Sequence, residues 1–131
     1  MLAFYLDEPL SEIEQNQVIQ QLKTSGISIE DCLDFKHINF EFSAEDSDLT
    51  HAEIIKVFEK NLQAASVTVA KPSIFILPKG GFRWGMLLQM AFKNITNYYP
   101  YVVQPWETNA NKVITRRDHL LVTDINSAMN N

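Results

Sequence analysis

The chain has 131 residues, 46% of them hydrophobic, with five prolines, four glycines and a net charge of −5. This length and composition suit one folded domain with its own core, and they exclude a disordered chain and a small scaffold that depends on disulfides. The single cysteine, Cys32, cannot form an internal disulfide, no secretory signal opens the chain, and no apolar run approaches the ~18 residues of a membrane helix. We therefore expect residues 1–131 to form a single cytoplasmic domain without a membrane partner.

Charge differs between the two halves of the chain. Residues 1–66 have a net charge of −9 and residues 67–131 a net charge of +4, and every arginine lies in the second half. The overall acidity argues against binding a long nucleic acid, whereas a basic region within an acidic protein suits a small anion. Arginine is the side chain best suited to phosphate. The sequence leaves open whether Arg116 and Arg117 bind a ligand or are solvated surface charges.

An apolar run, Leu2–Leu6, begins the chain and predicts a short buried strand. A helix should follow it, because Ser11 and Glu14 form a capping box before a set of apolar residues at helical spacing. The pair Ser25-Gly26 should end this helix. These residues predict a first βα unit.

The next stretch predicts a second extended segment and a second helix. Partial alternation of apolar residues favours extended backbone within residues 27–34 and 38–42, and the acidic residues 43–48 are typical of a loop. Thr50 and Glu53 then form a second capping box before a helical apolar stripe.

The second half continues the alternation of strand and helix. Ser73–Leu77 predicts a strand, Pro78–Arg83 a glycine turn, Trp84–Ile95 a helix and Tyr101–Pro105 another strand.

After the turn Asn109–Asn111, the segments Val113–Arg116 and His119–Ile125 predict terminal extended backbone. The whole pattern predicts a single Rossmann-like α/β domain of three layers, a mainly parallel central sheet with helices on both faces. Ligands of such sheets bind at the carboxyl ends of the strands. We therefore expect the loops Asp7–Ser11 and Pro78–Arg83 to lie side by side at the functional site.

The glycine turn contains the groups that bind an anion. Gly80 and Gly81 let backbone N–H groups approach a ligand closely, the helix that follows adds positive potential, and Lys79 and Arg83 add two full charges. The turn is neither a dinucleotide fingerprint, since no glycine follows the first strand, nor a P-loop, since Lys79 precedes both glycines.

Other chemistries find less support in the sequence. The potential metal ligands are scattered without ligand spacing, which argues against a metal site; they are Cys32, His37, His51 and His119. No Gly-x-Ser-x-Gly nucleophile elbow is present. Of the two tryptophans, Trp106 can stack on a base beyond its strand, whereas Trp84 begins a core helix and should pack under the sheet edge.

Several segments together resemble a known family. They are Pro9-Leu10-Ser11 after the first strand, Leu77-Pro78-Lys79-Gly80-Gly81 before the helix that contains Leu87-Leu88, and the final segment His119–Ile125. In this order they resemble the small stand-alone CARF-related proteins of type III CRISPR systems, which include ring nucleases. The likeness covers most of the chain, although each motif is short.

The resemblance implies a homodimer with a CARF-like fold that binds a cyclic oligoadenylate, cyclic tetra-adenylate above all, and removes it from antiviral signalling without metal or cofactor. The ligand-binding residues that we expect are Asp7, Pro9, Ser11, Pro78, Lys79, Gly80, Gly81, Arg83, Trp106 and Arg116. If the ring is cleaved, its own 2′-OH attacks the adjacent phosphate, with Lys79 and Arg83 as catalytic cations and His119 as a distant acid–base candidate.

Three alternatives stay open at this stage. The protein can cleave the ring slowly or only sequester it, and the sequence does not separate the two. A dimeric regulatory or interaction module without ligand chemistry is the alternative from another class, and a mononucleotide-dependent enzyme is a third. The uneven charge also leaves open an assembly larger than a dimer.

Overall fold

The computed structural model describes residues 1–26, 35–40, 48–65, 73–80 and 82–129. These residues form five strands, which are β1 (Leu2–Tyr5), β2 (Lys36–Asn39), β3 (Ser73–Ile76), β4 (Tyr101–Thr108) and β5 (Ile114–Thr123). They also form four helices, which are α1 (Glu12–Thr24), α2 (His51–Ala64), α3 (Phe82–Thr96) and α4 (Ile125–Met129). In the described part of the chain no helix has the length and apolar content to cross a membrane.

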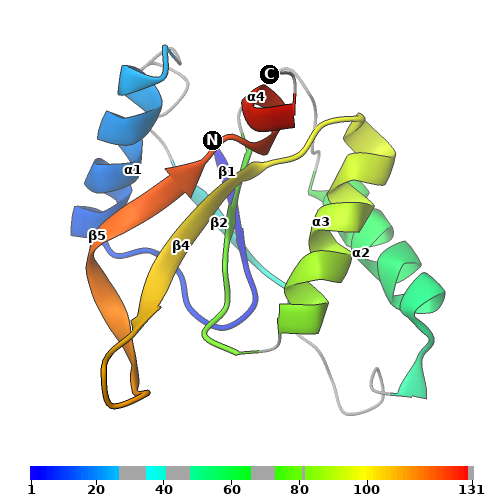
Figure 1. Ribbon diagram of the computed structural model, residues 1–131. Helices are drawn as coiled ribbons and strands as arrows, with labels where there is room; N and C mark the ends of the chain where they lie inside the picture. Colours follow the sequence, from blue (N-terminus) through cyan, green and yellow to red (C-terminus); the bar gives the residue numbers. More distant parts are fainter. Residues whose placement is uncertain (27–34, 41–47, 66–72, 81, 130–131) are drawn as a thin grey trace.

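The strands form one sheet in the order β2-β1-β3-β4-β5 (Figure 1). β1 pairs in parallel with β2 and β3, and β3 pairs in parallel with β4, whereas β4 and β5 form an antiparallel hairpin. This is the strand order of flavodoxin-like doubly wound sheets, in which successive strands are added to one side of β1 first and then, from β3 on, to its other side. The predicted α/β domain with a mainly parallel sheet is confirmed, and β5 makes the sheet mixed.

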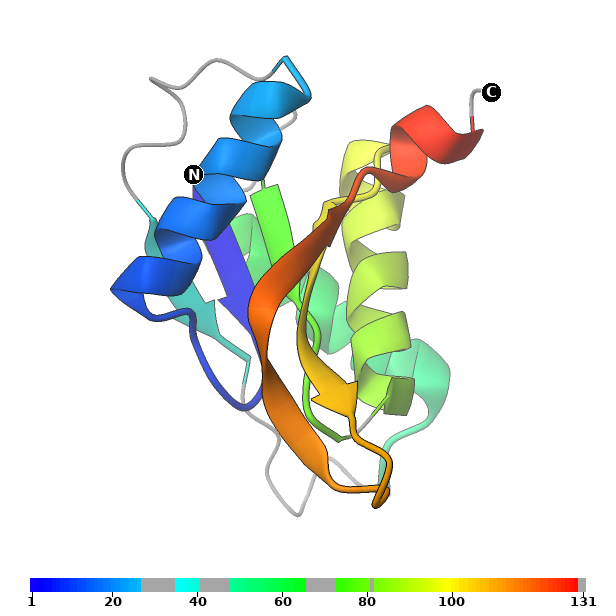
Figure 2. The same ribbon diagram turned by 60° about the vertical axis from the view of Figure 1, so that its left-hand side comes forward.

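Helices cover both faces of the sheet, α1 on one face and α2 with α3 on the other (Figures 1 and 2). Successive side chains of a strand point to opposite faces, so β1 places Ala3 in the core under α1 and Phe4 in the core under α2 and α3. Val18 and Leu22 belong to the first core and Phe58 to the second. Burial of each of these larger side chains contributes about 1.5–3 kcal/mol.

The predicted capping residues begin α1 and α2. The Ser11 hydroxyl accepts the N–H of Glu14 at 3.2 Å and the Ser11 N–H donates to Glu14 Oε1 at 2.9 Å, which completes the capping box. Thr50 accepts the N–H of Glu53 at 3.2 Å. After α1 the chain turns at Gly26 with φ +88°, in the left-handed region that glycine adopts without strain.

β5 is one strand where the sequence predicts two segments. Its pairing with β4 runs from Ile114 to Thr123 and is irregular between Gln104 and Trp106. Pro105 lies at this point and has no N–H for the ladder, which accounts for the break. The strand resumes its pairing beyond the break. The two extended segments predicted at Val113–Arg116 and His119–Ile125 therefore belong to one strand.

The end of β5 also differs from the prediction. The strand stops before Asp124, whose side chain accepts the N–H of Ser127 at 3.1 Å and begins the short helix α4. Extension of the strand to Ile125 is therefore wrong, because local capping competes with strand pairing there. The extended backbone predicted within residues 27–34, and residues 41–42 of the other extended segment, lie outside the described residues.

The side chains of α1 occupy the outer edge of β5. The Gln17 amide donates to Asp118 O at 2.9 Å and accepts the N–H of Leu120 at 3.0 Å. Four residues on, Gln21 donates to Leu120 O at 2.6 Å and accepts the N–H of Val122 at 3.1 Å. Each side-chain amide thus forms the two hydrogen bonds that the backbone of one residue in a neighbouring strand would form. The edge backbone is covered, which protects the sheet against pairing with another chain.

Candidate functional site

The two loops predicted to lie side by side are in contact. β1 and β3 are neighbours in the sheet, so their carboxyl ends lead into these loops from the same edge. The backbone N–H of Lys79 donates a hydrogen bond to Asp7 Oδ2 at 2.7 Å, although 72 residues separate them in the chain. An anionic oxygen of the protein itself therefore binds a backbone amide of the glycine turn.

A pocket of about 370 Å³, which we call the turn pocket, lies between this turn, the start of α3 and the end of β4. It is lined by Leu77, Pro78, Lys79, Gly80, Gly85, Met86, Gln89, Gln104 and Trp106. The lining combines apolar surface with two side-chain amides and one cation. That combination suits a ligand with both a flat apolar part and polar groups, and the volume lies near the lower end of the range for ligand pockets.

Two cations of the turn, Lys79 and Arg83, contact aromatic rings. Lys79 Nζ lies 5.4 Å from the ring centroid of Trp106, and the guanidinium carbon of Arg83 lies 4.3 Å from the ring centroid of Trp84. Within the part of the chain that the structure describes, neither side chain forms an ion pair with a carboxylate. Contacts of this kind are weak at exposed sites, about 0.5–1 kcal/mol. Lys79, which lines the turn pocket, can therefore turn toward a ligand there at small cost, whereas Arg83 is not among the described residues of the lining.

Arg116 is bound to the β1–α1 loop. Its guanidinium donates to both Glu14 oxygens at 2.6 and 2.8 Å and to the carbonyl of Pro9 at 3.1 Å. Glu8 lies 3.6 Å from Nη1 as a further carboxylate. The hydrogen bond to Glu14 raises the pKa of Arg116, against the opposing effect of burial, with smaller contributions from the charges of Glu8 and Asp7. Arg116 thus holds the first loop and the start of α1, and its predicted contact with a ligand stays a prediction.

The Glu14 carboxylate has opposing influences on its pKa. Burial raises the pKa, whereas the hydrogen bonds from Arg116 and Ser11 and the charge of Arg116 lower it. The lowering contributions prevail, and the pKa lies below the ordinary value of 4.5. Glu14 is thus ionised at neutral pH, and it holds both Arg116 and the start of α1.

Trp106 lies at the centre of these groups. Its ring contacts Lys79 at 5.4 Å and Arg116 at 4.6 Å, measured from the ring centroid. Its indole Nε1 is buried and has no hydrogen-bond partner among the described residues. Because two cations already contact the ring, a base that stacks on Trp106 has to displace Lys79 or bind at the ring edge.

The remaining predicted residues fall into three groups. Pro78 and Gly80 line the turn pocket as expected, and Gly80 has open space around the position of a Cβ atom. Pro9 contributes its carbonyl to Arg116, and Ser11 is occupied as the cap of α1. Gly81 lies outside the described residues.

Two further predictions concern side chains near the turn and on β5. Trp84 is partly buried and packs against the core under α2 and α3, as the sequence predicts. His119 lines a separate shallow hollow beside α1 and is absent from the lining of the turn pocket.

Sequence reasoning missed three residues of this region. Gln104 and Gln89 line the turn pocket, and Glu14 anchors Arg116 across 102 positions of the chain. A glutamine carries no sequence signal for binding. Glu14 is recognisable in the sequence only as a capping residue, and nothing in its neighbourhood indicates a distant arginine.

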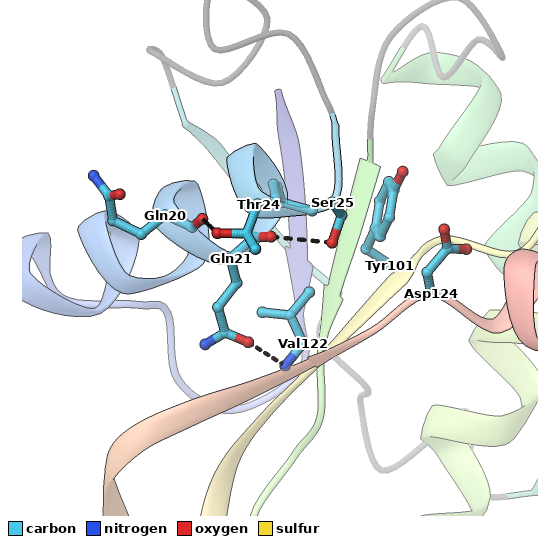
Figure 3. A pocket seen from close by; sticks show the side chains of 8 residues that line it. Gln20, Gln21, Thr24, Ser25, Tyr101, Val122 and Asp124 are labelled. Atoms are coloured by element: carbon cyan, nitrogen blue, oxygen red, sulfur yellow. Dashed lines mark hydrogen bonds between the residues drawn. The ribbon is translucent and has the colours of Figure 1, made fainter.

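A second pocket, of about 340 Å³, lies at the opposite edge of the sheet, between the end of α1 and the starts of β4 and α4 (Figure 3). Its polar groups are bonded to one another: Thr24 donates to Gln20 O, Ser25 to Gln21 O, and Gln21 holds Val122. Among the described residues no lysine or arginine lines it, and the carboxyl end of a helix carries negative potential. This pocket is therefore unsuited to an anion.

Comparisons with protein-family models, curated proteins and solved structures find no match to this chain. Within the described residues, no three His, Cys, Asp or Glu side chains gather in a group that could hold a metal ion. The evidence for the candidate site is therefore the geometry and the charge of the residues around the glycine turn.

Proposed function

We propose that the protein binds a cyclic oligoadenylate, cyclic tetra-adenylate above all, in the turn pocket and removes it from antiviral signalling of the type III CRISPR kind. The ligand class and the assignment to the CARF-related proteins come from the sequence resemblance. The observation that most supports the binding of an anion at the turn is the hydrogen bond from the Lys79 N–H to the Asp7 carboxylate at 2.7 Å. It demonstrates that an amide of the glycine turn is directed at an anionic oxygen.

The chemistry of the ligand fits the groups around the turn. A phosphodiester needs N–H donors and cations, which the turn offers as the Lys79 amide and the Lys79 and Arg83 side chains. An adenine needs a flat apolar surface and hydrogen-bonding groups at its edge, for which Trp106, Gln89 and Gln104 are present in the lining. The neutral amides give selectivity for a base without adding charge.

The size of the turn pocket favours a two-fold assembly. A volume of about 370 Å³ holds about one nucleotide unit and not a ring of four. Beside the pocket, Met86 and Met90 of α3 and Leu121 of β5 are 46–49% exposed. Met86 and Gln104 line the same pocket, and Gln104 pairs with Leu121 across the hairpin, so this apolar surface adjoins the site. A second copy seated there would place two turn pockets around one symmetric ring.

Sequestration is the form of removal that the pocket favours. Ring opening requires the 2′-OH oxygen to form a bond to phosphorus while the bond from phosphorus to the 5′ oxygen breaks, and the 2′-OH proton has to reach a base. The described lining of the turn pocket contains neither a histidine nor a carboxylate, and the Asp7 carboxylate, which contacts the turn from outside this lining, is hydrogen-bonded to the Lys79 amide. Lys79 and Arg83 can stabilise the developing charge, so cleavage, where it occurs, is slow.

A mononucleotide-binding enzyme is the second candidate, and the volume of the turn pocket favours it, because one nucleotide fills about this space.

Gel retardation and chromatography with labelled cyclic tetra-adenylate distinguish the cyclic ligand from the mononucleotide, with AMP and linear tetra-adenylate as competitors. We expect retardation at micromolar protein that the cyclic ligand alone reverses, with the ring intact for many minutes. No retardation would refute the proposed function, and competition by AMP at equal concentration would favour the mononucleotide.

The dimer has its own test. Analytical ultracentrifugation should find a dimer for the unaltered chain and a monomer for the double variant Met86→Glu, Met90→Glu. The variant Val57→Glu, at an exposed apolar residue of α2, is the matched control and should stay dimeric. A monomer at all concentrations for the unaltered chain would contradict the two-fold pocket.

A further inference from the structure

We propose that Asp7 is an internal competitor for the backbone amide of Lys79, a residue of the turn pocket: the Asp7 carboxylate occupies this amide and leaves it when an anionic ligand binds. This inference rests on the proposed function in one respect, that the turn pocket receives a phosphate. It reverses the role that the sequence predicts for Asp7, from a ligand contact to a group that the ligand displaces.

The geometry of the contact is the first support. The distance from Lys79 N to Asp7 Oδ2 is 2.7 Å, which is short for a backbone N–H donor and typical of a charged acceptor. A carboxylate and a phosphate present the same kind of oxygen to an amide. The one N–H donor of the turn whose partner the structure defines is therefore already occupied by an anion of the chain.

Electrostatics make simultaneous binding unfavourable. Asp7 and a phosphate on the same amide would place two negative charges within hydrogen-bonding distance of one donor, where like charges repel. Lys79 and Arg83 attract the ligand, and Asp7 opposes it from the other loop. The ligand has to replace the Asp7 contact before it gains the Lys79 amide.

A second position for the Asp7 side chain is present nearby. Arg116 Nη1 is buried and has no hydrogen-bond partner among the described residues, and its nearest carboxylate, Glu8, lies 3.6 Å away. Arg116 also donates to the carbonyl of Pro9, two residues after Asp7 in the same loop, at 3.1 Å. Asp7 therefore has a cation to which it can turn when it releases the amide.

The competitor sets a threshold for the ligand. A single free phosphate gains one contact and loses the Asp7 contact, so it binds weakly. A ring of several phosphates and bases makes many contacts at once and overcomes the same loss. Asp7 thus lowers the affinity for both kinds of ligand by the same factor, and only a ligand with many further contacts keeps a useful affinity.

Three variants test this with two probes, cyclic tetra-adenylate and inorganic pyrophosphate, by isothermal titration calorimetry. Asp7→Ala removes the competitor, and Asp7→Asn removes its charge but keeps an acceptor. Glu8→Gln removes the same charge from the neighbouring exposed residue, which does not contact the Lys79 amide, and is the matched control. We expect Asp7→Ala to raise the affinity for both probes about five- to tenfold, Asp7→Asn less, and Glu8→Gln less than twofold.

Every outcome decides between the two proposals. Equal gains in Asp7→Ala and Glu8→Gln, or a loss of affinity in Asp7→Ala, would overturn the competitor role while leaving the proposed function intact. A gain for pyrophosphate without any binding of cyclic tetra-adenylate would support the competitor and refute the ligand. If neither the unaltered protein nor any of the three variants binds either probe, both proposals fail. Thermal unfolding of each variant checks its fold, and Asp7→Asn keeps the test decisive if Asp7→Ala does not fold.

Discussion

The cations at the carboxyl edge of the sheet belong to two regions that the fold treats differently. Arg116 and Arg117, beside the break in the β4–β5 ladder, are each paired with a carboxylate, at 2.6 Å to Glu14 and 3.8 Å to Glu107. Lys79 and Arg83, in the glycine turn, contact aromatic rings instead. The basic second half of the chain is therefore not one continuous surface of unpaired cations. Arg116 and Arg117 on β5 form ion pairs within the protein, whereas Lys79 and Arg83 have no carboxylate partner among the described residues.

Replacement of Lys79 and Arg83 together by alanine is the change that should separate the two regions most clearly. Each charged hydrogen bond to a ligand contributes about 1.5–3 kcal/mol, so the double variant should bind cyclic tetra-adenylate about 100-fold more weakly or worse. Its thermal midpoint should fall by only a few degrees, because each side chain loses a cation–π contact of about 0.5–1 kcal/mol and neither is ion-paired within the described residues. Fluorescence anisotropy with labelled ligand and calorimetric melting give the two values.

A matched control for that variant is Lys56→Ala with Lys60→Ala on α2, both exposed. It removes the same net charge far from the turn in the chain. Loss of binding in both double variants would show that overall charge, and not the turn, accounts for affinity.

Arg116→Ala should show the opposite behaviour, a loss of stability first. It leaves Glu14, whose side chain is 12% exposed, and the Pro9 carbonyl without their donor. We expect the free energy of unfolding to fall by about 2 kcal/mol in urea denaturation. Arg116→Lys should recover less than half of it, because an ammonium cannot donate to both Glu14 oxygens in the planar geometry.

Arg117→Ala is the comparison variant on the same strand. Its carboxylate partner Glu107 is 47% exposed at 3.8 Å, so the expected loss is about 1 kcal/mol or less. Equal losses in the two variants would mean that the Glu14 contact adds nothing beyond an ordinary surface ion pair.

Gln21→Ala should have a smaller effect on the cover of the β5 edge. It removes two neutral hydrogen bonds to the backbone of Leu120 and Val122, which together contribute about 1 kcal/mol. Chemical denaturation gives the loss, and light scattering should detect association through the uncovered edge. Gln20→Ala, at the exposed neighbouring position, should change neither, and an effect of the same size there would contradict the specific role of Gln21.

The smallest expected effect is the pH dependence that Glu14 contributes. The pKa of Glu14 in the folded chain lies below its ordinary value of 4.5, so its ionised form stabilises the fold above pH 4.5. This stabilisation is lost as the pH falls below 4.5 through the lowered pKa. Glu14→Gln should therefore be about 0.5–1 kcal/mol less stable at pH 7, and the difference should shrink below pH 4.5. A constant difference between pH 7 and pH 3 would exclude this contribution.

Local signals in the sequence predicted much of the fold. The apolar run at Leu2–Leu6, the caps Ser11 and Thr50 and the glycine turn all depend on neighbouring residues, and the structure places elements where they indicate. The adjacency of the loops after β1 and β3 also followed from the general geometry of α/β sheets.

What the sequence could not predict depends on contacts between distant residues. The antiparallel direction of β5 results from its hairpin with β4, and the break at Pro105 determines where Arg116 meets Glu14. The hydrogen bond between Asp7 and Lys79 joins residues 72 positions apart, and no local pattern of either loop indicates it. Only the structure therefore separates the cations that are paired with carboxylates, Arg116 and Arg117, from those that contact aromatic rings, Lys79 and Arg83.

The most direct test of the account is an amide NMR titration of the unaltered protein with cyclic tetra-adenylate. The account predicts that the N–H signals of Lys79 and Gly80 shift in a saturable way, because the ligand replaces the Asp7 carboxylate at the glycine turn. The signals of Ser25 and Asp124, at the opposite pocket, should stay in place. Saturable shifts confined to the opposite pocket, or no shifts at millimolar ligand, would contradict it.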